Sequence, residues 1–86
     1  MEVDTKTIIK IIEIIRNNIS IDNEISENTN MRKDIDIDSF DVLMIMNAID
    51  DEYGISVEEE DFKQVNTPLE IVKLLSEKYG INGTEK

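Results

Sequence analysis

Apolar residues follow a helical period in three stretches of this chain, and the first stretch covers residues 4–18. Isoleucines recur there at intervals of three and four residues, while charged residues fall mostly elsewhere. This spacing predicts an amphipathic helix that starts at Asp4 or Thr5 and ends near Asn18. Its predicted inner face consists of Ile8, Ile11, Ile12, Ile15 and Ile19.

The second periodic stretch follows an acidic segment and starts at Ser39. Asp38 is a favoured N-cap residue, and Asp41 lies at the third helical position, where a carboxylate interacts favourably with the helix dipole. Gly54 is typical of the left-handed residue that ends a helix, so we expect a helix over residues 39–53. Its predicted inner face consists of Phe40, Leu43, Met46 or Asn47, Ile49 or Asp50, and Tyr53, of which Met46 and Ile49 fit best.

Two capping-box patterns, a Ser or Thr followed three residues later by Glu, predict two more helices. The first box starts at Ser56 and predicts a short helix over about residues 57–63. The second starts at Thr67, has a proline at the first helical position, and predicts a helix over about residues 68–79 that ends at Gly80. The inner face of this last helix is predicted to contain Leu69, Val72, Leu75 and Tyr79, with Ile71 beside them.

Residues 19–37 show no sustained period, but they carry more large apolar side chains than a disordered linker would. We therefore expect a packed connecting loop with one short turn, and we expect residues 81–86 to form a flexible tail. The expected loop anchors are Ile19, Ile21, Ile25, Met31, Ile35 and Ile37. The predicted fold is one all-α domain over residues 1–86, a small four-helix bundle with three main helices and one short helix.

The residue inventory argues against an enzyme. The chain has 86 residues and contains neither cysteine nor histidine, which removes thiol nucleophiles, thiolate metal sites and any Ser-His-Asp triad. The longest apolar stretch is interrupted by Lys10 and Glu13 and is too short to cross a bilayer, and no signal-peptide pattern opens the chain. We expect a cytoplasmic protein that does not insert into membranes.

The acidic charge is concentrated in one third of the chain. The net charge is −11, and residues 34–62 contain 11 acidic residues and no Lys or Arg. The remaining 9 acidic and 9 basic residues balance each other. Nucleic acids and anionic membranes are poor partners for such a surface, whereas basic patches on proteins are good ones.

Ser39 is the residue most suited to chemistry, because its hydroxyl lies at a helix N-terminus within the acidic segment. One alternative is a calcium loop, since Asp34, Asp36 and Asp38 have the spacing of the first three ligands of an EF-hand. The sixth position of that loop would be Ser39 instead of glycine, and the twelfth would be Ile45 instead of glutamate. Another alternative is that the acids are a solvated face and Ser39 only helps to start the helix.

The sequence Asp38-Ser39-Phe40 resembles the Asp-Ser-Leu motif of acyl carrier proteins and related phosphopantetheine-binding carrier domains. The resemblance extends from about Ile35 to Leu75 and includes the acidic end of the second helix. It implies that a separate phosphopantetheinyl transferase, using magnesium, attaches 4′-phosphopantetheine from coenzyme A to Ser39. Acyl or aminoacyl intermediates would then be carried as thioesters on this arm. It implies a non-catalytic carrier with no resident metal.

The same resemblance implies a docking face on the second helix and a cleft for the acyl chain. Acidic residues of that face would meet Arg and Lys of the transferase and of acyl-transferring or synthase enzymes. The implied docking residues are Asp38, Asp41, Met44, Asn47, Asp50 and Asp51. The implied cleft residues are Phe40, Met46, Ile49, Ile71 and Val72, although an ordinary core role is the favoured interpretation of these apolar positions.

Four departures from the family pattern affect these expectations. Asp36 stands where the family often has glycine, so a positive φ is expected to be tolerated there, and Phe40 replaces the usual leucine. Met44 stands where fatty-acid carriers usually place an acid, and Asn47 where they usually have an apolar residue. These changes leave the attachment site intact but weaken the case for the general fatty-acid role, so both fatty-acid biosynthesis and a specialised polyketide, peptide or surface-polymer pathway stay open. We expect the carrier to be a discrete monomer. The alternative function is an unmodified acidic adaptor that binds a basic protein.

Overall fold

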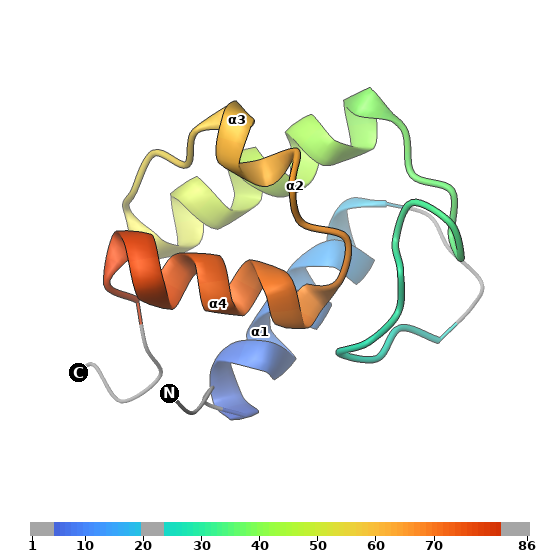
Figure 1. Ribbon diagram of the computed structural model, residues 1–86, viewed down its shortest axis with the longest axis horizontal. Coiled ribbons are helices and arrows are strands. Elements are labelled where there is room, and N and C mark those ends of the chain that lie inside the picture. The colour runs from blue at the N-terminus through green and yellow to red at the C-terminus, as the bar shows by residue number, and fades with distance from the viewer. Residues whose placement is uncertain (1–4, 20–23, 82–86) are drawn as a thin grey trace.

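The computed structural model describes residues 5–19 and 24–81. Within these ranges the chain forms four α-helices and no strand: α1 (Thr5–Asn18), α2 (Ser39–Tyr53), α3 (Glu59–Phe62) and α4 (Pro68–Tyr79). α1 packs against both α2 and α4, and α3 forms a single turn between α2 and α4 in the chain (Figure 1). The predicted all-α fold, with three main helices and one short helix, is confirmed.

The centre of the core contains residues one helical turn apart on the three long helices. Side chains four residues apart lie on the same face of a helix, and full burial of each contributes about 1.5–3 kcal/mol. Phe62 is 1% exposed, so even the short α3 adds a large aromatic side chain to the core. The completely buried pairs are Ile11 and Ile15 of α1, Ile45 and Ile49 of α2, and Ile71 and Leu75 of α4.

The inner face of α1 is broader than predicted. Thr7 and Ile14 are buried in addition to the expected isoleucines, while Ile12 is only partly buried. The proposed start at Asp4 lies outside the described residues, and the helix is described from Thr5. The predicted members that are buried are Ile8, Ile11, Ile15 and Ile19.

The predicted inner face of α2 is wrong at its first two members. Phe40 is 66% exposed and Leu43 is 51% exposed, whereas Ile45, Met46 and Ile49 are buried. α2 carries large apolar side chains on two sides, so its periodicity did not identify the side that faces the core. The contact with α1 selects the side that contains Ile45.

The capping box predicted at Ser56 does not form, and α3 is shorter than expected. Glu58 precedes the helix, and its side chain makes no capping hydrogen bond. Other helices bind the preceding backbone instead. The Asp50 carboxylate accepts the N–H of Val57 at 2.8 Å, and the Tyr79 hydroxyl accepts the N–H of Glu58 at 2.9 Å.

Both ends of α4 follow the prediction. The Thr67 hydroxyl accepts the N–H of Glu70 at 3.1 Å, and the Glu70 carboxylate accepts the N–H of Thr67 at 3.3 Å. Pro68 occupies the first turn, and Gly80 ends the helix in the left-handed conformation with φ 70°. Of the predicted inner face, Ile71, Val72 and Leu75 are buried, and Leu69 and Tyr79 are partly buried.

The predicted flexible tail is wrong at its first residue. The N–H of Ile81 donates to the carbonyl of Leu75 at 2.9 Å, and its side chain packs against the core. Ile81 is therefore part of the folded domain. The rest of the predicted tail, residues 82–86, lies outside the described residues.

Residues 24–38, which precede α2, form a packed loop, as predicted, and this loop lies beside the start of α4 (Figure 1). Met31 is 1% exposed, and its N–H donates to the carbonyl of Asn66 at 2.7 Å. A second backbone hydrogen bond joins Leu69 to the carbonyl of Glu27 at 3.0 Å. The loop makes a turn at residues 27–28 and another at 31–34. Of the expected anchors, Ile19, Ile25 and Met31 are buried, Ile35 and Ile37 are partly buried, and Ile21 lies outside the described residues.

Candidate functional site

Ser39 is the first residue of α2, and its side chain is exposed. The residue before it, Asp38, is the N-cap and accepts the N–H of Asp41 at 3.0 Å. The Asp41 carboxylate in turn accepts the N–H of Asp38 at 3.3 Å, which completes a capping box. The two aspartates therefore hold the first turn in place and leave the Ser39 hydroxyl accessible to another molecule.

The chain approaches Ser39 through a left-handed residue. Asp36 has φ 54° and, among the described residues, is the one non-glycine residue with a positive φ. This conformation confirms the expectation drawn from the aspartate that replaces the family's glycine, because Asp is one of the few residue types that adopt it readily. The following residue, Ile37, donates its N–H to the carbonyl of Met31 at 3.2 Å. The approach to α2 is thus fixed to a buried part of the loop.

A hollow of about 350 Å³ lies beside Ser39. It contains two cations, Arg32 and Lys63, although the acidic segment between them has no basic residue. The sequence analysis did not single out either cation. The one sequence feature that could have indicated them is that they lie near the two ends of the acidic segment, residues 34–62. The hollow is lined by Arg32, Ile37 and Asp38 of the loop, Ser39 and Val42 of α2, and Glu59 and Lys63 of the α3 region.

Two of the three carboxylates considered for calcium, Asp34 and Asp38, accept hydrogen bonds from nearby backbone N–H groups. Asp34 accepts the N–H of Asn30 at 2.9 Å, and Asp38 caps α2. In the described ranges, no group of three or more acidic side chains is arranged to hold a metal ion. The geometry gives no support to the calcium alternative.

The predicted docking residues of α2 fall into two groups. Asn47 and Asp51 are exposed, and Met44 is partly buried. Asp41 and Asp50 are partly buried, and their carboxylates accept backbone hydrogen bonds. The prediction missed Leu43, which is half-exposed on the same helix as Ser39.

Four of the five predicted cleft residues come together in the core. Met46, Ile49, Ile71 and Val72 are all buried and belong to one apolar cluster. Phe40 does not belong to it, because most of its surface is exposed. We therefore remove Phe40 from the predicted cleft.

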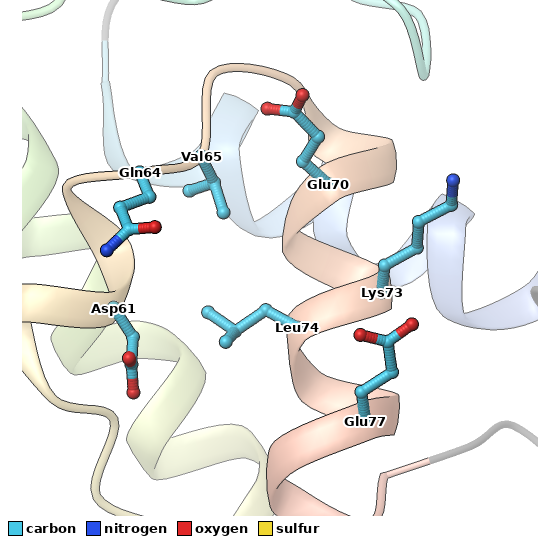
Figure 2. Close-up of a pocket in the computed structure, with 7 residues that line it drawn as sticks. All are labelled: Asp61, Gln64, Val65, Glu70, Lys73, Leu74 and Glu77. Atoms are coloured by element: carbon cyan, nitrogen blue, oxygen red, sulfur yellow. The ribbon is translucent and has the colours of Figure 1, made fainter.

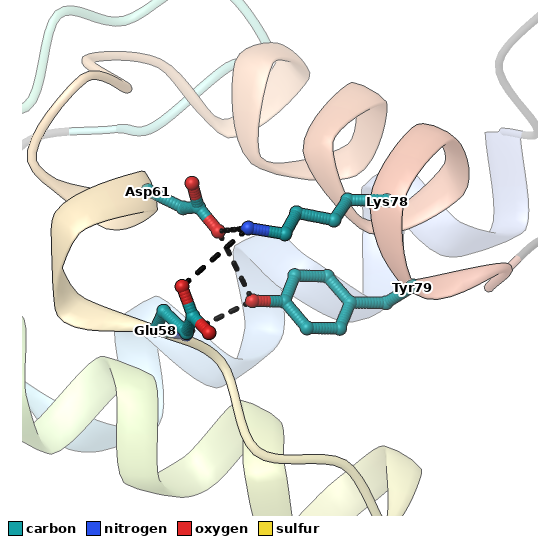
Figure 3. Close-up of polar contacts among 4 residues, drawn as sticks. All are labelled: Glu58, Asp61, Lys78 and Tyr79. Atoms are coloured by element: carbon teal, nitrogen blue, oxygen red, sulfur yellow. Dashed lines mark hydrogen bonds and ion pairs between the residues drawn. The ribbon is translucent and has the colours of Figure 1, made fainter.

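A polar cluster joins α3 to α4 (Figure 3). The Lys78 ammonium binds the carboxylates of Asp61 and Glu58, the latter at 3.5 Å, and the Tyr79 hydroxyl donates to Asp61 at 3.2 Å. The hydrogen bond from Lys78 lowers the pKa of Asp61, and the same bond raises the pKa of Lys78. These contacts hold the short α3 against the C-terminal part of α4.

A second surface hollow, of about 310 Å³, lies between α3 and α4 (Figure 2). Its rim is polar and of mixed charge, with Lys73 between Glu70 and Glu77 along α4, and the Leu74 side chain extends across it toward α3. Ser39 is not among its lining residues. This hollow therefore does not adjoin the serine.

No helix in the described part of the chain is long and apolar enough to cross a membrane.

The described residues form a small, acidic helical domain with an exposed serine at a capped helix start. Comparison with known proteins identifies the class to which such a domain belongs. A sequence model of a family described as a phosphopantetheine attachment site matches residues 10–75. The chain therefore belongs to this family.

Curated relatives are acyl carrier proteins of bacteria. The chain is 32% identical to one from Petrotoga mobilis over 74 residues, which cover 85% of this chain and 87% of the relative. It is 29% identical to one from Lactobacillus acidophilus over 72 residues, with 83% and 90% covered, and 29% identical to one from Syntrophobacter fumaroxidans over 69 residues, with 79% and 85% covered.

Membership in the family confirms the carrier role and the cofactor, 4′-phosphopantetheine. It also confirms that the chain is a non-catalytic substrate of a phosphopantetheinyl transferase. Carriers of this family interact with transferase and synthase enzymes. The exposed Ser39 hydroxyl fits such a group, because it can form a phosphodiester without displacing any hydrogen bond that caps α2.

Proposed function

We propose that Ser39 carries the phosphopantetheine arm and that acyl or aminoacyl groups travel on it as thioesters. The observation that carries this proposal is the exposed hydroxyl in the first turn of α2, between the two aspartates of a capping box. In the transfer, the Ser39 oxygen forms a new bond to the phosphorus that bears pantetheine. The hydroxyl proton passes to the transferase, and adenosine bisphosphate leaves from coenzyme A.

The residues of this chain position the hydroxyl and need not activate it. The free N–H groups at the start of α2 favour a negatively charged phosphodiester. Asp38 and Asp41 keep that start ordered through their reciprocal hydrogen bonds. The base and the magnesium ion belong to the transferase, which explains how a chain without histidine or cysteine takes part in covalent chemistry.

The proposed docking surface is the exposed side of α2, and its partners carry basic patches. It consists of the acids Asp38, Asp41, Asp50 and Asp51 together with Met44 and Asn47. Charge complementarity of this kind speeds association and allows easy dissociation. The carrier is proposed to act as a cytoplasmic monomer, since a net charge of −11 opposes self-association and the chain has no cysteine.

The acyl chain is proposed to enter the core beside Met46, Ile49, Ile71 and Val72. Their burial in one apolar cluster supports this route, and the flexible methionine side chain suits a variable occupant. The partly buried Met44 and the exposed, neutral Asn47 on the docking helix support a specialised pathway. Carriers of the general fatty-acid pathway usually place an acid at the first of these positions.

Intact mass spectrometry tests the assignment of Ser39. The protein is incubated with coenzyme A, magnesium and a broad-specificity phosphopantetheinyl transferase. We expect the mass to rise by one phosphopantetheine, and we expect Ser39→Ala to prevent the rise. Ser56→Ala is the matched control, because Ser56 is an exposed serine that caps no helix, and it should be modified like the wild type. An unmodified wild-type chain would favour the acidic adaptor, and modification of Ser39→Ala would exclude Ser39.

A further inference from the structure

Folding brings two cations from opposite ends of the acidic segment to the hollow beside Ser39. Arg32 lies in the loop before α2 and Lys63 follows α3, and both line that hollow. The acidic segment, residues 34–62, contributes 11 acidic residues and no basic one. Any negative charge attached to Ser39 therefore lies in an acidic stretch of chain with these two cations beside it.

Arg32 is held in place by neutral oxygen atoms. Its Nε donates to the side-chain oxygen of Asn66 at 3.1 Å and to the carbonyl of Val65 at 3.4 Å, and Nη2 donates to the carbonyl of Phe62 at 3.3 Å. In the described residues, no carboxylate forms an ion pair with it. The guanidinium is thus fixed in position while its charge is not neutralised by a direct partner.

Lys63 has an exposed side chain and, within the described residues, likewise forms no ion pair. Two carboxylates line the same hollow. Asp38 is engaged with the start of α2, which leaves Glu59 as the acid that competes for Lys63. The hollow therefore holds two cations, one engaged carboxylate and one competing carboxylate.

We propose that Arg32 and Lys63 bind the phosphodiester of the arm attached to Ser39. The proposal rests on the assignment of Ser39 made above. A phosphodiester carries one negative charge and accepts hydrogen bonds well from a guanidinium and from an ammonium group. Its covalent bond to Ser39 keeps it next to the hollow, so even weak contacts are formed without a cost of association. The part of the arm nearest Ser39 then lies toward α3. Glu59 weakens the contact between Lys63 and the phosphodiester, because its carboxylate competes for Lys63.

The test compares amide chemical shifts of the unmodified and the modified chain, with mass spectrometry confirming modification first. In the wild type, we expect attachment to shift amides of residues 59–65 and the Arg32 side-chain N–H as well as residues 38–42. In Lys63→Gln, attachment of the arm should change the amide chemical shifts of residues 59–65 much less than in the wild type. Glu59→Gln should increase that change. For each variant, the chemical shifts of its modified form are compared with those of its own unmodified form. The direct effect of the substitution on the shifts therefore cancels.

Lys33→Gln is the matched control, since Lys33 is an exposed loop lysine next to Arg32 that does not line the hollow. It removes the same charge and should retain the wild-type pattern. Shifts confined to residues 38–42, or equal losses in Lys63→Gln and Lys33→Gln, would overturn the proposal. A chain that gains no mass would instead refute the assignment of Ser39, so the two failures are distinguishable.

Discussion

The carboxylate of Asp50 accepts the backbone N–H of Val57 at 2.8 Å, and this contact fastens the end of α2 to the extended segment before α3. Val57 is buried, and Asp50 is partly buried. An acid that sequence patterns place on a docking face therefore also holds the fold. Its neighbour Asp51 is exposed and has no such role in the described structure. The two aspartates should consequently respond differently to substitution.

The first prediction concerns stability. Asp50→Ala removes the acceptor of the Val57 N–H and should lower the free energy of unfolding by about 1 kcal/mol. Asp50→Asn retains an oxygen acceptor and should cost less, while Asp51→Ala should change stability by less than about 0.5 kcal/mol. Urea unfolding followed by circular dichroism measures all three. Equal effects of Asp50→Ala and Asp51→Ala would show that the contact with Val57 contributes nothing.

The second prediction concerns docking and uses Asp51, because changes at Asp50 would also disturb the fold. Asp51→Lys should slow modification by a basic transferase at low ionic strength, and the difference should shrink as salt is added. Glu77→Lys, an equal change of charge at an exposed site on α4, is the control and should have little effect. Equal slowing by both variants would mean that net charge alone, and not α2, guides the encounter.

Local signals in the sequence predicted most helix ends correctly. The N-cap at Asp38, the box at Thr67 and the glycines at 54 and 80 act through neighbours a few residues away, so the sequence contains the whole interaction. The box at Ser56 failed because its competitors are distant in sequence. Asp50 and Tyr79 bind the backbone there, and no local pattern reveals them.

The exposed side of α2 and the cations beside Ser39 could not be predicted for the same physical reason. α2 is apolar on two sides, and only its packing against α1 decides which side is buried. Arg32 and Lys63 meet at one hollow because the loop is bonded to the segment between α3 and α4. Ser39, the proposed attachment residue, could be singled out from the sequence, since its motif and its helix cap are contiguous in the chain.

The third prediction tests which side of α2 faces the core. Ile45→Ala should lower the free energy of unfolding by about 2–5 kcal/mol, because it leaves a cavity in a fully buried site. Phe40→Ala and Leu43→Ala remove larger or equal side chains from exposed positions and should each cost less than about 1 kcal/mol. Denaturant unfolding distinguishes these values. A large loss of stability in Phe40→Ala would mean that the originally predicted face is the buried one.

The last prediction concerns the response of stability to pH through Asp61 and Lys78. The hydrogen bond from Lys78 lowers the pKa of Asp61 in the folded state, so its stabilising effect is present above the ordinary pKa of an aspartate. It is lost as the pH falls through the lowered value. The pKa of Lys78 is raised, chiefly by the same bond, so its contribution is present below the ordinary pKa of a lysine and is lost as the pH rises through the raised value.

The midpoint temperature of thermal unfolding, measured from acidic to alkaline pH, tests both effects. We call its fall at low pH the acid limb and its fall at high pH the alkaline limb. Asp61→Asn should flatten the acid limb and the alkaline limb, because it removes the charge that stabilises the Lys78 ammonium. Glu77→Gln removes an exposed carboxylate of α4 that makes no ion pair within the described residues, and it should leave both limbs as they are in the wild type. Added salt should reduce the Asp61 effect, since the pair lies at the surface. If Asp61→Asn and Glu77→Gln gave the same profile, the bond between α3 and α4 would not contribute to stability.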